Sequence, residues 1–276
     1  MIDELDIALT APTARMAVRQ LRAGVWSDAE DDLAEEVPVA LEYNGVSHAV
    51  MLATPADIAE FALGFSLSEG IIGSVREFYD VDISESAEGI TARIEIASGA
   101  FARLKDRRRS MVGRTGCGLC GVDSLAQVIR PLACVGPARA LSAGAIRRAL
   151  AGVKGLQPLN RQTGAMHAAL WCDAHGVLRA GFEDVGRHNA LDKLIGALAR
   201  DGVDLAAGFA LITSRASVEM VQKAATVGIS ALVAISAPTA LAARTAQACG
   251  LTLVAFARGN DFVAYAHGDN IDMDAA

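Results

Sequence analysis

Short apolar runs alternate with helix-forming stretches over residues 209–266, and this alternation constrains the fold more than any other feature. Two of the runs are followed closely by Ser, Thr or Pro, which favour helix starts. Strands joined through helices by short connections form parallel sheets with right-handed crossovers, so we predict an α/β fold. The expected strands are Phe209–Thr213, Ala231–Ile235 and Leu251–Phe256, with helices at Ser217–Val227 and Pro238–Cys249, and Phe262–Ala266 is a candidate further strand.

A hairpin followed by a helix predicts a smaller α+β unit nearer the N-terminus. Asn44-Gly45 lies between two apolar runs, and this pair supplies the two positive φ angles of a type I′ turn. Thr54 is placed as an N-cap, with Pro55 at the first helical position. The predicted elements are the strands Val37–Tyr43, Val46–Leu52 and Ile90–Ala97, and a helix from Thr54 to about Glu69 that ends at Gly70.

These patterns divide the chain into four segments. We expect an irregular acidic tail over residues 1–35, the small α+β domain over 36–110, a mobile connecting loop over 111–124 and the α/β domain over 125–276. Within the last segment, Ala168–Cys172 and Val177–Phe182 predict a hairpin around His175-Gly176, and Asn189–Arg200 predicts a helix.

The composition excludes several classes of protein. A net charge of -7 over 276 residues argues against general nucleic-acid binding. The N-terminus carries Asp3, Glu4 and Asp6 and lacks the apolar stretch of a signal peptide. No apolar run approaches the roughly 20 residues of a membrane span. Five cysteines, three of them isolated, do not form a secreted disulfide framework, so we expect a cytoplasmic protein.

Two cysteines in a glycine frame, Gly116-Cys117-Gly118-Leu119-Cys120-Gly121, are the strongest chemical signal. The glycines leave both thiols accessible. A basic run over residues 103–114 precedes the pair, and a short predicted helix, Leu125–Arg130, follows it. Nearby cations and a helix N-terminus lower a cysteine pKa from its free value of about 8.5 and favour the nucleophilic thiolate. The basic run itself is either a solvated face or a docking site for an anion or partner.

Metal binding and redox exchange are rival explanations of the cysteine pair. A structural zinc needs four ligands, usually two such pairs, and only one is present, although a zinc shared by two subunits stays open. Zinc-deaminase chemistry needs His-x-Glu ahead of Pro-Cys-x-x-Cys, and here Ala168-Ala169 follow His167. A thioredoxin-type pair normally follows the first strand of a small βαβ domain, whereas this pair lies in a mid-chain connector.

Polar clusters follow the expected parallel strands at their carboxyl ends, where α/β sheets bind ligands. Ser214 and Arg215 follow the first strand, Ser236 the second, and Phe256-Ala257-Arg258-Gly259-Asn260-Asp261 spans the end of the last. Helix N-termini and arginines together favour an anionic ligand, plausibly a nucleotide. The alternative is that the Ser and Thr side chains only cap helices.

A further polar cluster, Glu183 through Asn189, lies immediately before a predicted helix. His188 stands there beside Arg187, and His167 follows the small residues Gly164-Ala165. Both histidines are candidates for ligand binding or for a structural role. His48, His175 and His267 lack comparable neighbours, so we interpret them as structural.

Several motifs occur together along the chain. They are Thr54-Pro55 through Gly64-Phe65 and Glu69-Gly70, the Cys117–Cys120 loop, Glu183 through Ala190 with Asp192-Lys193, Ser214 through Ser217 with Glu219 and Lys223, and Ser236 through Thr239. A chain with this set resembles the FdhD/NarQ family, the sulfurtransferases required for formate dehydrogenase activity. The resemblance runs from about Val37 to Tyr265, with one departure at Ala165, where the family usually has a second glycine.

The resemblance implies an activity and a fold. A cysteine desulfurase would pass sulfur to Cys117 as a persulfide, with Cys120 as an assisting thiol. The protein would transfer it to the molybdenum or tungsten cofactor with two pterin guanine dinucleotides, which serves apo-formate dehydrogenase. It further implies a three-layer, cytidine-deaminase-like C-terminal domain with a parallel-rich sheet, a small N-terminal α+β domain and a homodimer.

Site residues follow from the same resemblance and from the strand-end clusters. We expect the cofactor, with GDP as a partial mimic, to contact Phe256, Ala257, Arg258, Gly259, Asn260, Asp261, Ser214, Arg215, Ser236, His167 and His188. We expect no bound metal, nucleic acid or membrane. A thiol–disulfide oxidoreductase and a cofactor-binding chaperone without covalent chemistry remain as alternatives.

Overall fold

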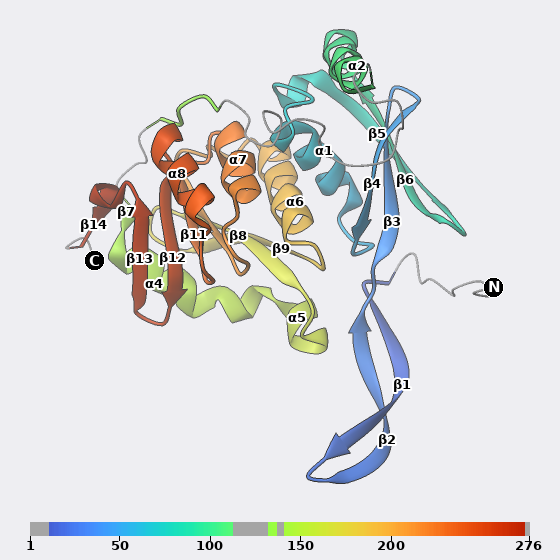
Figure 1. The fold of residues 1–276 in the computed structure, drawn as a ribbon, viewed down its shortest axis with the longest axis vertical. Helices are drawn as coiled ribbons and strands as arrows, with labels where there is room; N and C mark the ends of the chain where they lie inside the picture. The colour runs from blue at the N-terminus through green and yellow to red at the C-terminus, as the bar shows by residue number, and fades with distance from the viewer. Residues whose placement is uncertain (1–10, 113–131, 137–140, 274–276) are drawn as a thin grey trace.

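The computed structural model describes residues 11–112, 132–136 and 141–273, and it has two sheet-containing halves and a projecting hairpin (Figure 1). The N-terminal half is a four-stranded sheet in the order β4-β3-β6-β5, and the C-terminal half a six-stranded sheet in the order β13-β12-β11-β10-β8-β9. The strands of the first half are β3 (Val37–Tyr43), β4 (Val46–Ala53), β5 (Phe78–Ser86) and β6 (Gly89–Ile96), with the helices α1 (Ile58–Ser68) and α2 (Ser98–Val112) and the 3₁₀ turn η1 (Val75–Glu77).

The six-stranded sheet confirms the predicted α/β core. Its strands β10 (Gly208–Ile212), β11 (Ala231–Ala234) and β12 (Thr252–Arg258) are parallel neighbours, connected through the helices α7 (Val218–Thr226) and α8 (Ala240–Cys249). Antiparallel strands extend it on both sides. They are β13 (Asp261–Ala266) next to β12, and the hairpin β8 (His167–Asp173) and β9 (Leu178–Asp184) next to β10.

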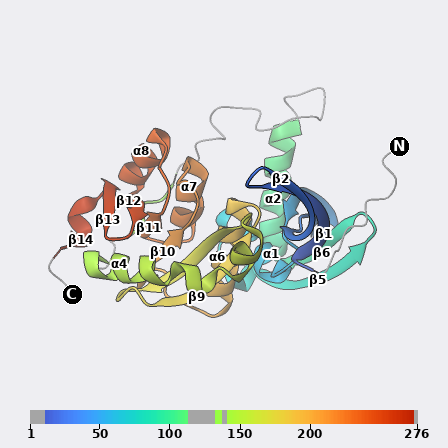
Figure 2. The same ribbon diagram turned by 90° about the horizontal axis from the view of Figure 1, so that it is seen from below.

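Helices cover both faces of this sheet (Figure 2). On β10, Ala210 and Ile212 pack with α7, α8 and the helix α6 (Arg187–Arg200), whereas Phe209 and Leu211 pack with α4 (Ala143–Gly152) on the other face. This alternation is the period of two that a strand buried on both faces requires. The remaining elements are β7 (Leu141–Ser142), η2 (Val153–Leu156), α5 (Pro158–Thr163), η3 (Gly268–Asn270) and β14 (Ile271–Asp272), with β14 parallel to β7.

The small N-terminal unit is confirmed as α+β, although its helix starts later than predicted. Asn44 and Gly45 have φ angles of 47° and 79°, as the type I′ turn requires. The helix α1 begins at Ile58 after Asp57, so the predicted N-cap at Thr54 is wrong. Thr54 is fully buried, and its backbone amide donates to Asp184 Oδ2 at 3.0 Å. The Thr54 hydroxyl oxygen, which a cap would use, instead accepts from the Val185 amide at 3.1 Å.

Residues 13–34 correct the expectation of an irregular tail. They form β1 (Thr13–Arg22) and β2 (Val25–Ala34), ten residue pairs in continuous antiparallel register. The hairpin projects away from both sheets (Figure 1). Its turn residues Ala23 and Gly24 have φ angles of 49° and 81°, so a type I′ turn is present without the usual Asn or Asp at its first position. Ala23-Gly24 is a weaker turn signal than Asn-Gly, and the many acidic residues of β2 resemble those of a tail, so the sequence pattern does not predict this hairpin.

The two halves meet where α1 packs closely on α6. Gly64 and Gly196 face each other across this contact: a Cβ on Gly64 would lie 1.7 Å from the Asp192 carbonyl oxygen, and one on Gly196 1.9 Å from the Glu60 carbonyl oxygen. Both positions therefore need glycine because the helix backbones touch, not because of a positive φ.

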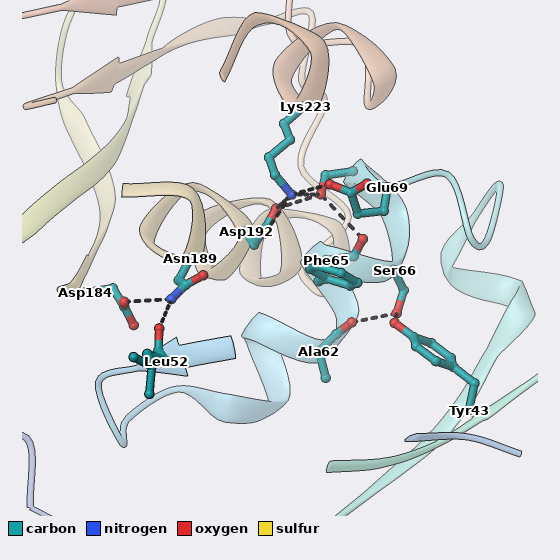
Figure 3. Close-up of polar contacts among 11 residues, drawn as sticks. Tyr43, Leu52, Ala62, Phe65, Ser66, Glu69, Asp184, Asn189, Asp192 and Lys223 are labelled. Atoms are coloured by element: carbon teal, nitrogen blue, oxygen red, sulfur yellow. Dashed lines mark hydrogen bonds and ion pairs between the residues drawn. The ribbon is translucent and has the colours of Figure 1, made fainter. Parts of the chain in front are cut away.

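A buried polar network joins the same helices (Figure 3). Lys223 Nζ, from α7, lies 2.8 Å from Asp192 Oδ2 of α6 and 2.9 Å from Glu69 Oε1 at the end of α1. The Ser68 hydroxyl donates to Asp192 Oδ1 at 2.6 Å. Burial lowers the pKa of Lys223, but Asp192 and Glu69 outweigh this and the net shift is upward, so the lysine is charged.

A second buried ion pair involves Lys193, the residue that follows Asp192 in α6. Lys193 Nζ is 2.7 Å from Asp184 Oδ2, and both side chains are fully buried. Lys193 also donates to the Thr54 carbonyl oxygen at 3.1 Å, and Asn189 Nδ2 donates both to Asp184 Oδ1 at 3.0 Å and to the Leu52 carbonyl oxygen at 2.8 Å. Lys193 and Asn189 of α6 thus connect the end of β9 to the end of β4 and the residue after it.

We predict that Gly64→Ala destabilises the protein by about 1–3 kcal/mol or more, because the added methyl forces α1 and α6 apart. Gly99→Ala in α2 is the matched control: its Cβ would meet only the end of the Arg103 side chain at 3.7 Å, so a helix glycine is replaced at no steric cost. Urea denaturation measures both. Equal stabilities of the two variants would contradict the close packing.

We predict that Lys223→Met costs about 3–5 kcal/mol, because Asp192 is left buried beside an uncharged side chain. Adding Asp192→Asn to the same chain should recover part of this loss. Arg179→Met is the control, since Arg179 pairs with Asp173 at 2.7 Å but is 61% exposed, and exposed pairs contribute less than about 1 kcal/mol. If Lys223→Met is as stable as the Arg179→Met control, the buried network does not contribute to the free energy of unfolding.

Candidate functional site

The predicted strand-end clusters lie along one edge of the six-stranded sheet. The β8–β10 pairing places His167 beside the end of β10, where the Ala168 amide donates to Thr213 Oγ1 at 2.9 Å. The Phe256 amide donates to the Ser236 carbonyl oxygen at 3.1 Å, and Arg258 Nε donates to the Ile235 carbonyl oxygen at 3.2 Å. The structure therefore brings to one edge residues as far apart in the sequence as His167 and Arg258.

The β12–β13 turn is the most exposed part of this edge. Phe256 is 43% exposed and has a φ of 50°, a conformation that non-glycine residues rarely adopt. Its ring lies 6.4 Å from that of Tyr265, which sequence reasoning missed. Gly259 has a φ of 59° with open space beside it, and Arg147 Nε donates to the Asn260 carbonyl oxygen at 3.1 Å. An aromatic pair and two arginines thus flank an open turn.

The strand-to-helix junctions are only partly explained by capping. Thr239 caps α8, its hydroxyl accepting from the Ala242 amide at 3.1 Å, and α8 begins at Ala240, so the predicted start at Pro238 is wrong. Ala216 forms a parallel bridge with Pro238, which holds the two junctions side by side. Ser214 is buried and Arg215 exposed at the same edge, so the Arg215 guanidinium is the accessible charge.

The polar cluster from Glu183 to Asn189 has divided roles. Both carboxylate oxygens of Glu183 accept backbone amides at the start of α5, from Leu159 and Asn160 at 2.8 Å, so Glu183 caps that helix. Asp184 and Asn189 belong to the buried network described above. Arg187 Nε and His188 Nε2 are buried yet have no hydrogen-bond partner among the residues that the structure describes. They are the members of this cluster that fit a ligand site.

Both predicted histidines are uncharged near neutral pH. Burial, followed by the charges of Arg187 and Lys223, lowers the pKa of His188 to about 4. Burial and Arg187 lower the pKa of His167, and Asp184 opposes this shift. Each imidazole therefore offers one donor and one acceptor nitrogen, and the arginines supply the positive charge at this edge.

The reactive pair Cys117 and Cys120 lies outside the described residues. The described part of the basic run forms α2, where Arg103 pairs with Glu77 at 3.0 Å and Arg107 donates to the Glu69 carbonyl oxygen at 3.3 Å. Helix α2 and the β12–β13 turn lie at opposite ends of the view in Figure 1. The described structure thus assembles the strand-end residues but does not bring α2 to them.

Two further searches are confined to the described residues. Within these ranges, three or more His, Cys, Asp or Glu side chains never gather as metal ligands would. None of the helices described is both long enough and apolar enough to cross a lipid bilayer.

Comparisons with known proteins agree with the motifs. The FdhD/NarQ family profile matches residues 34–272. A protein named sulfur carrier protein FdhD from Variovorax paradoxus is 53% identical over 263 residues, covering 95% of both chains. One of the same name from Cupriavidus necator is 53% identical over 260 residues, covering 94% of this chain and 90% of its own.

A solved structure supports the fold. The crystal structure of a protein assigned as a formate dehydrogenase accessory protein from Desulfotalea psychrophila superposes with a TM-score of 0.74 at 23% identity, covering 95% of this chain and 100% of its own. At that identity the match speaks for the fold alone. The family profile and the two close relatives show that this chain belongs to the FdhD/NarQ family.

Proposed function

We propose that the protein carries sulfur, as a persulfide on Cys117, from a cysteine desulfurase to a molybdenum cofactor that bears two guanine dinucleotides and is destined for formate dehydrogenase. The observation that carries this proposal is the 53% identity, over nearly the whole chain, to proteins named sulfur carriers. The glycine-framed thiols of the motif fit that role, because the thiolate is the nucleophile in sulfur exchange.

The first step is a thiol exchange. The Cys117 thiolate attacks the terminal sulfur of the persulfide on the desulfurase, the donor S–S bond breaks, and the donor cysteine leaves as a thiolate. In the second step the Cys120 thiolate attacks Cys117 Sγ, a Cys117–Cys120 disulfide forms, and the terminal sulfur leaves as sulfide for the metal. A cellular thiol then reduces the disulfide. Cys120 is thus the assisting thiol, and the cofactor is the substrate.

The strand-end edge is the proposed binding site for that substrate. Arg258, Arg215 and Arg187 offer guanidinium groups for diphosphate oxygens, and Phe256 with Tyr265 offers an aromatic face for a base. The other predicted contacts with the substrate stay predictions. They involve His167, His188, Ser214, Ser236 and the turn residues Ala257, Gly259, Asn260 and Asp261.

Three other expectations accompany the proposal. They are that the six-stranded sheet and its helices form the family's cytidine-deaminase-like domain, that the protein is a cytoplasmic homodimer, and that GDP mimics part of the substrate. The exposed apolar tip of the β1–β2 hairpin, with Trp26 57% and Leu21 54% exposed, favours self-association.

Each of the two alternative functions predicts a result that differs from sulfur transfer. The first result is read in a host that lacks the family protein. A cofactor-binding chaperone without covalent chemistry would restore formate dehydrogenase activity with both Cys117 and Cys120 changed to Ala. A thiol–disulfide oxidoreductase would reduce generic disulfides, with Cys117–Cys120 as its redox couple.

We predict that Cys117→Ala abolishes sulfur loading, because no thiolate remains at the carrier position. After incubation with desulfurase and cysteine, intact mass spectrometry should show one labile sulfur on the wild type and on Cys120→Ala, and none on Cys117→Ala. Cys120→Ala should load but fail to release sulfide. Loading of Cys117→Ala to the wild-type level would overturn the assignment.

We predict that Arg258→Ala weakens GDP binding about tenfold or more, since hydrogen bonds to charged groups contribute about 1.5–3 kcal/mol. Arg179→Ala, at the opposite edge of the same sheet, is the matched control and should leave the affinity unchanged. Isothermal titration measures both. Equal affinities for the Arg258→Ala, Asn260→Ala and wild-type chains would remove the turn from the site.

A further inference from the structure

Two cysteines that the proposed chemistry does not use lie on adjacent chain segments. Cys134 is exposed in residues 132–136, and Cys249 is the last residue of α8 and is 2% exposed. The sequence gives no reason to connect them, because 115 positions separate the two.

Backbone contacts hold the segments together. The Val135 amide donates to the Cys249 carbonyl oxygen at 2.9 Å, so it satisfies one of the carbonyls that a helix C-terminus leaves free. The Val135 side chain packs into the same apolar cluster as Cys249. A Cβ on Gly250 would lie 3.2 Å from the Val135 carbonyl oxygen, which shows how closely the two backbones approach.

That spacing suits a disulfide. The Cα of Cys134 is two bonds from the Val135 nitrogen, and the Cα of Cys249 is two bonds from its own carbonyl oxygen, so the 2.9 Å hydrogen bond between these atoms holds the two Cα atoms within about 8 Å of each other. Disulfides form with Cα atoms about 4.4–6.8 Å apart. The environments are also unequal: burial and the neighbouring Cys134 raise the pKa of Cys249, whereas the Cys134 side chain meets solvent.

We propose that Cys134 and Cys249 form a reversible disulfide when the protein meets a hydroperoxide. The Cys134 thiolate attacks the peroxide, whose O–O bond breaks, and Cys134 becomes a sulfenic acid while water or an alcohol leaves. The Cys249 thiolate then attacks that sulfur, the S–O bond breaks, water leaves, and the S–S bond forms. The peroxide is the oxidant, the two thiols supply both electrons, and a thiol reductant restores the pair.

The disulfide fastens residues 132–136 covalently to the end of α8. This segment comes soon after Cys117 and Cys120 in the chain. Because the reaction needs neither of those cysteines, it is independent of the proposed sulfur transfer, and the two ideas fail separately.

The test uses the full chain with Cys117→Ser and Cys120→Ser, so that the carrier cysteines cannot form mixed products. After treatment with hydrogen peroxide and alkylation, non-reducing peptide mapping should find Cys134 linked to Cys249, with the link lost on reduction. Cys172→Ser in the same chain is the matched control, because Cys172 is buried in β8 and should not alter the link.

Two further variants separate the attack of Cys134 on the peroxide from the attack of Cys249 on the sulfenic acid. In Cys249→Ser, Cys134 should accumulate as a sulfenic acid that dimedone traps. In Cys134→Ser, an exposed change that leaves the core intact, Cys249 should stay reduced under the same peroxide treatment. The decisive chain retains both Cys134 and Cys249. If peroxide oxidises Cys134 to a sulfinic acid in this chain while Cys249 can still be fully alkylated, the proposal is overturned.

Discussion

The buried ion pair between Lys223 and Asp192 is the interaction on which the arrangement of the two halves depends. It links α7 and α6 of the larger sheet, and Glu69 and Ser68 extend it to α1 of the smaller one. Desolvating such a pair costs about as much as its attraction returns, so its contribution is greatest to specificity: other packings of α1 on α6 would leave a charge without its partner. The contact of Gly64 and Gly196 with the facing backbones fixes the same packing sterically.

The second pair, Lys193 with Asp184, connects this junction to the strand-end edge. Asp184 is the last residue of β9, and its carboxylate also accepts the Gly186 amide at 2.7 Å just before α6. The network therefore sets where α6 begins and where Arg187 and His188 lie. The same buried contacts thus link the helix junction to the proposed binding site.

Local signals predicted much of the fold. Asn44-Gly45, the apolar strands and the Gly250 helix end act within a few residues, and each was confirmed. Prediction failed where distant contacts override local preference. Thr54 has the chemistry of an N-cap, yet its hydroxyl oxygen accepts from the amide of Val185, 131 positions away. Sequence reasoning missed the strands β1, β2 and β5 and the helices α2, α4 and α5, because their charges or lengths resemble those of loops.

Sequence reasoning predicted where the candidate site lies better than what each of its residues does. Strand order alone places Ser214, Ser236 and Arg258 at one edge, since parallel strands end together. Whether a charged residue serves a ligand or the interior depends on its burial. Asp192 and Lys193 can be recognised in the sequence because they are charged residues within the apolar run from Ala190 to Ile195. Charged residues in such a run are buried, and each then needs an oppositely charged partner from another element.

Burial also decides which groups give the strand-end edge its positive charge. His188 has an ordinary pKa of 6.5 when exposed and about 4 here, so it is protonated only when the pH falls to about 4, and the pKa of His167 shifts in the same direction. Arginines keep their charge throughout. The positive charge of the proposed binding site therefore comes from Arg187, Arg215 and Arg258, and it stays constant across the neutral range. The histidines contribute directional hydrogen bonds instead, since a neutral imidazole can both donate and accept.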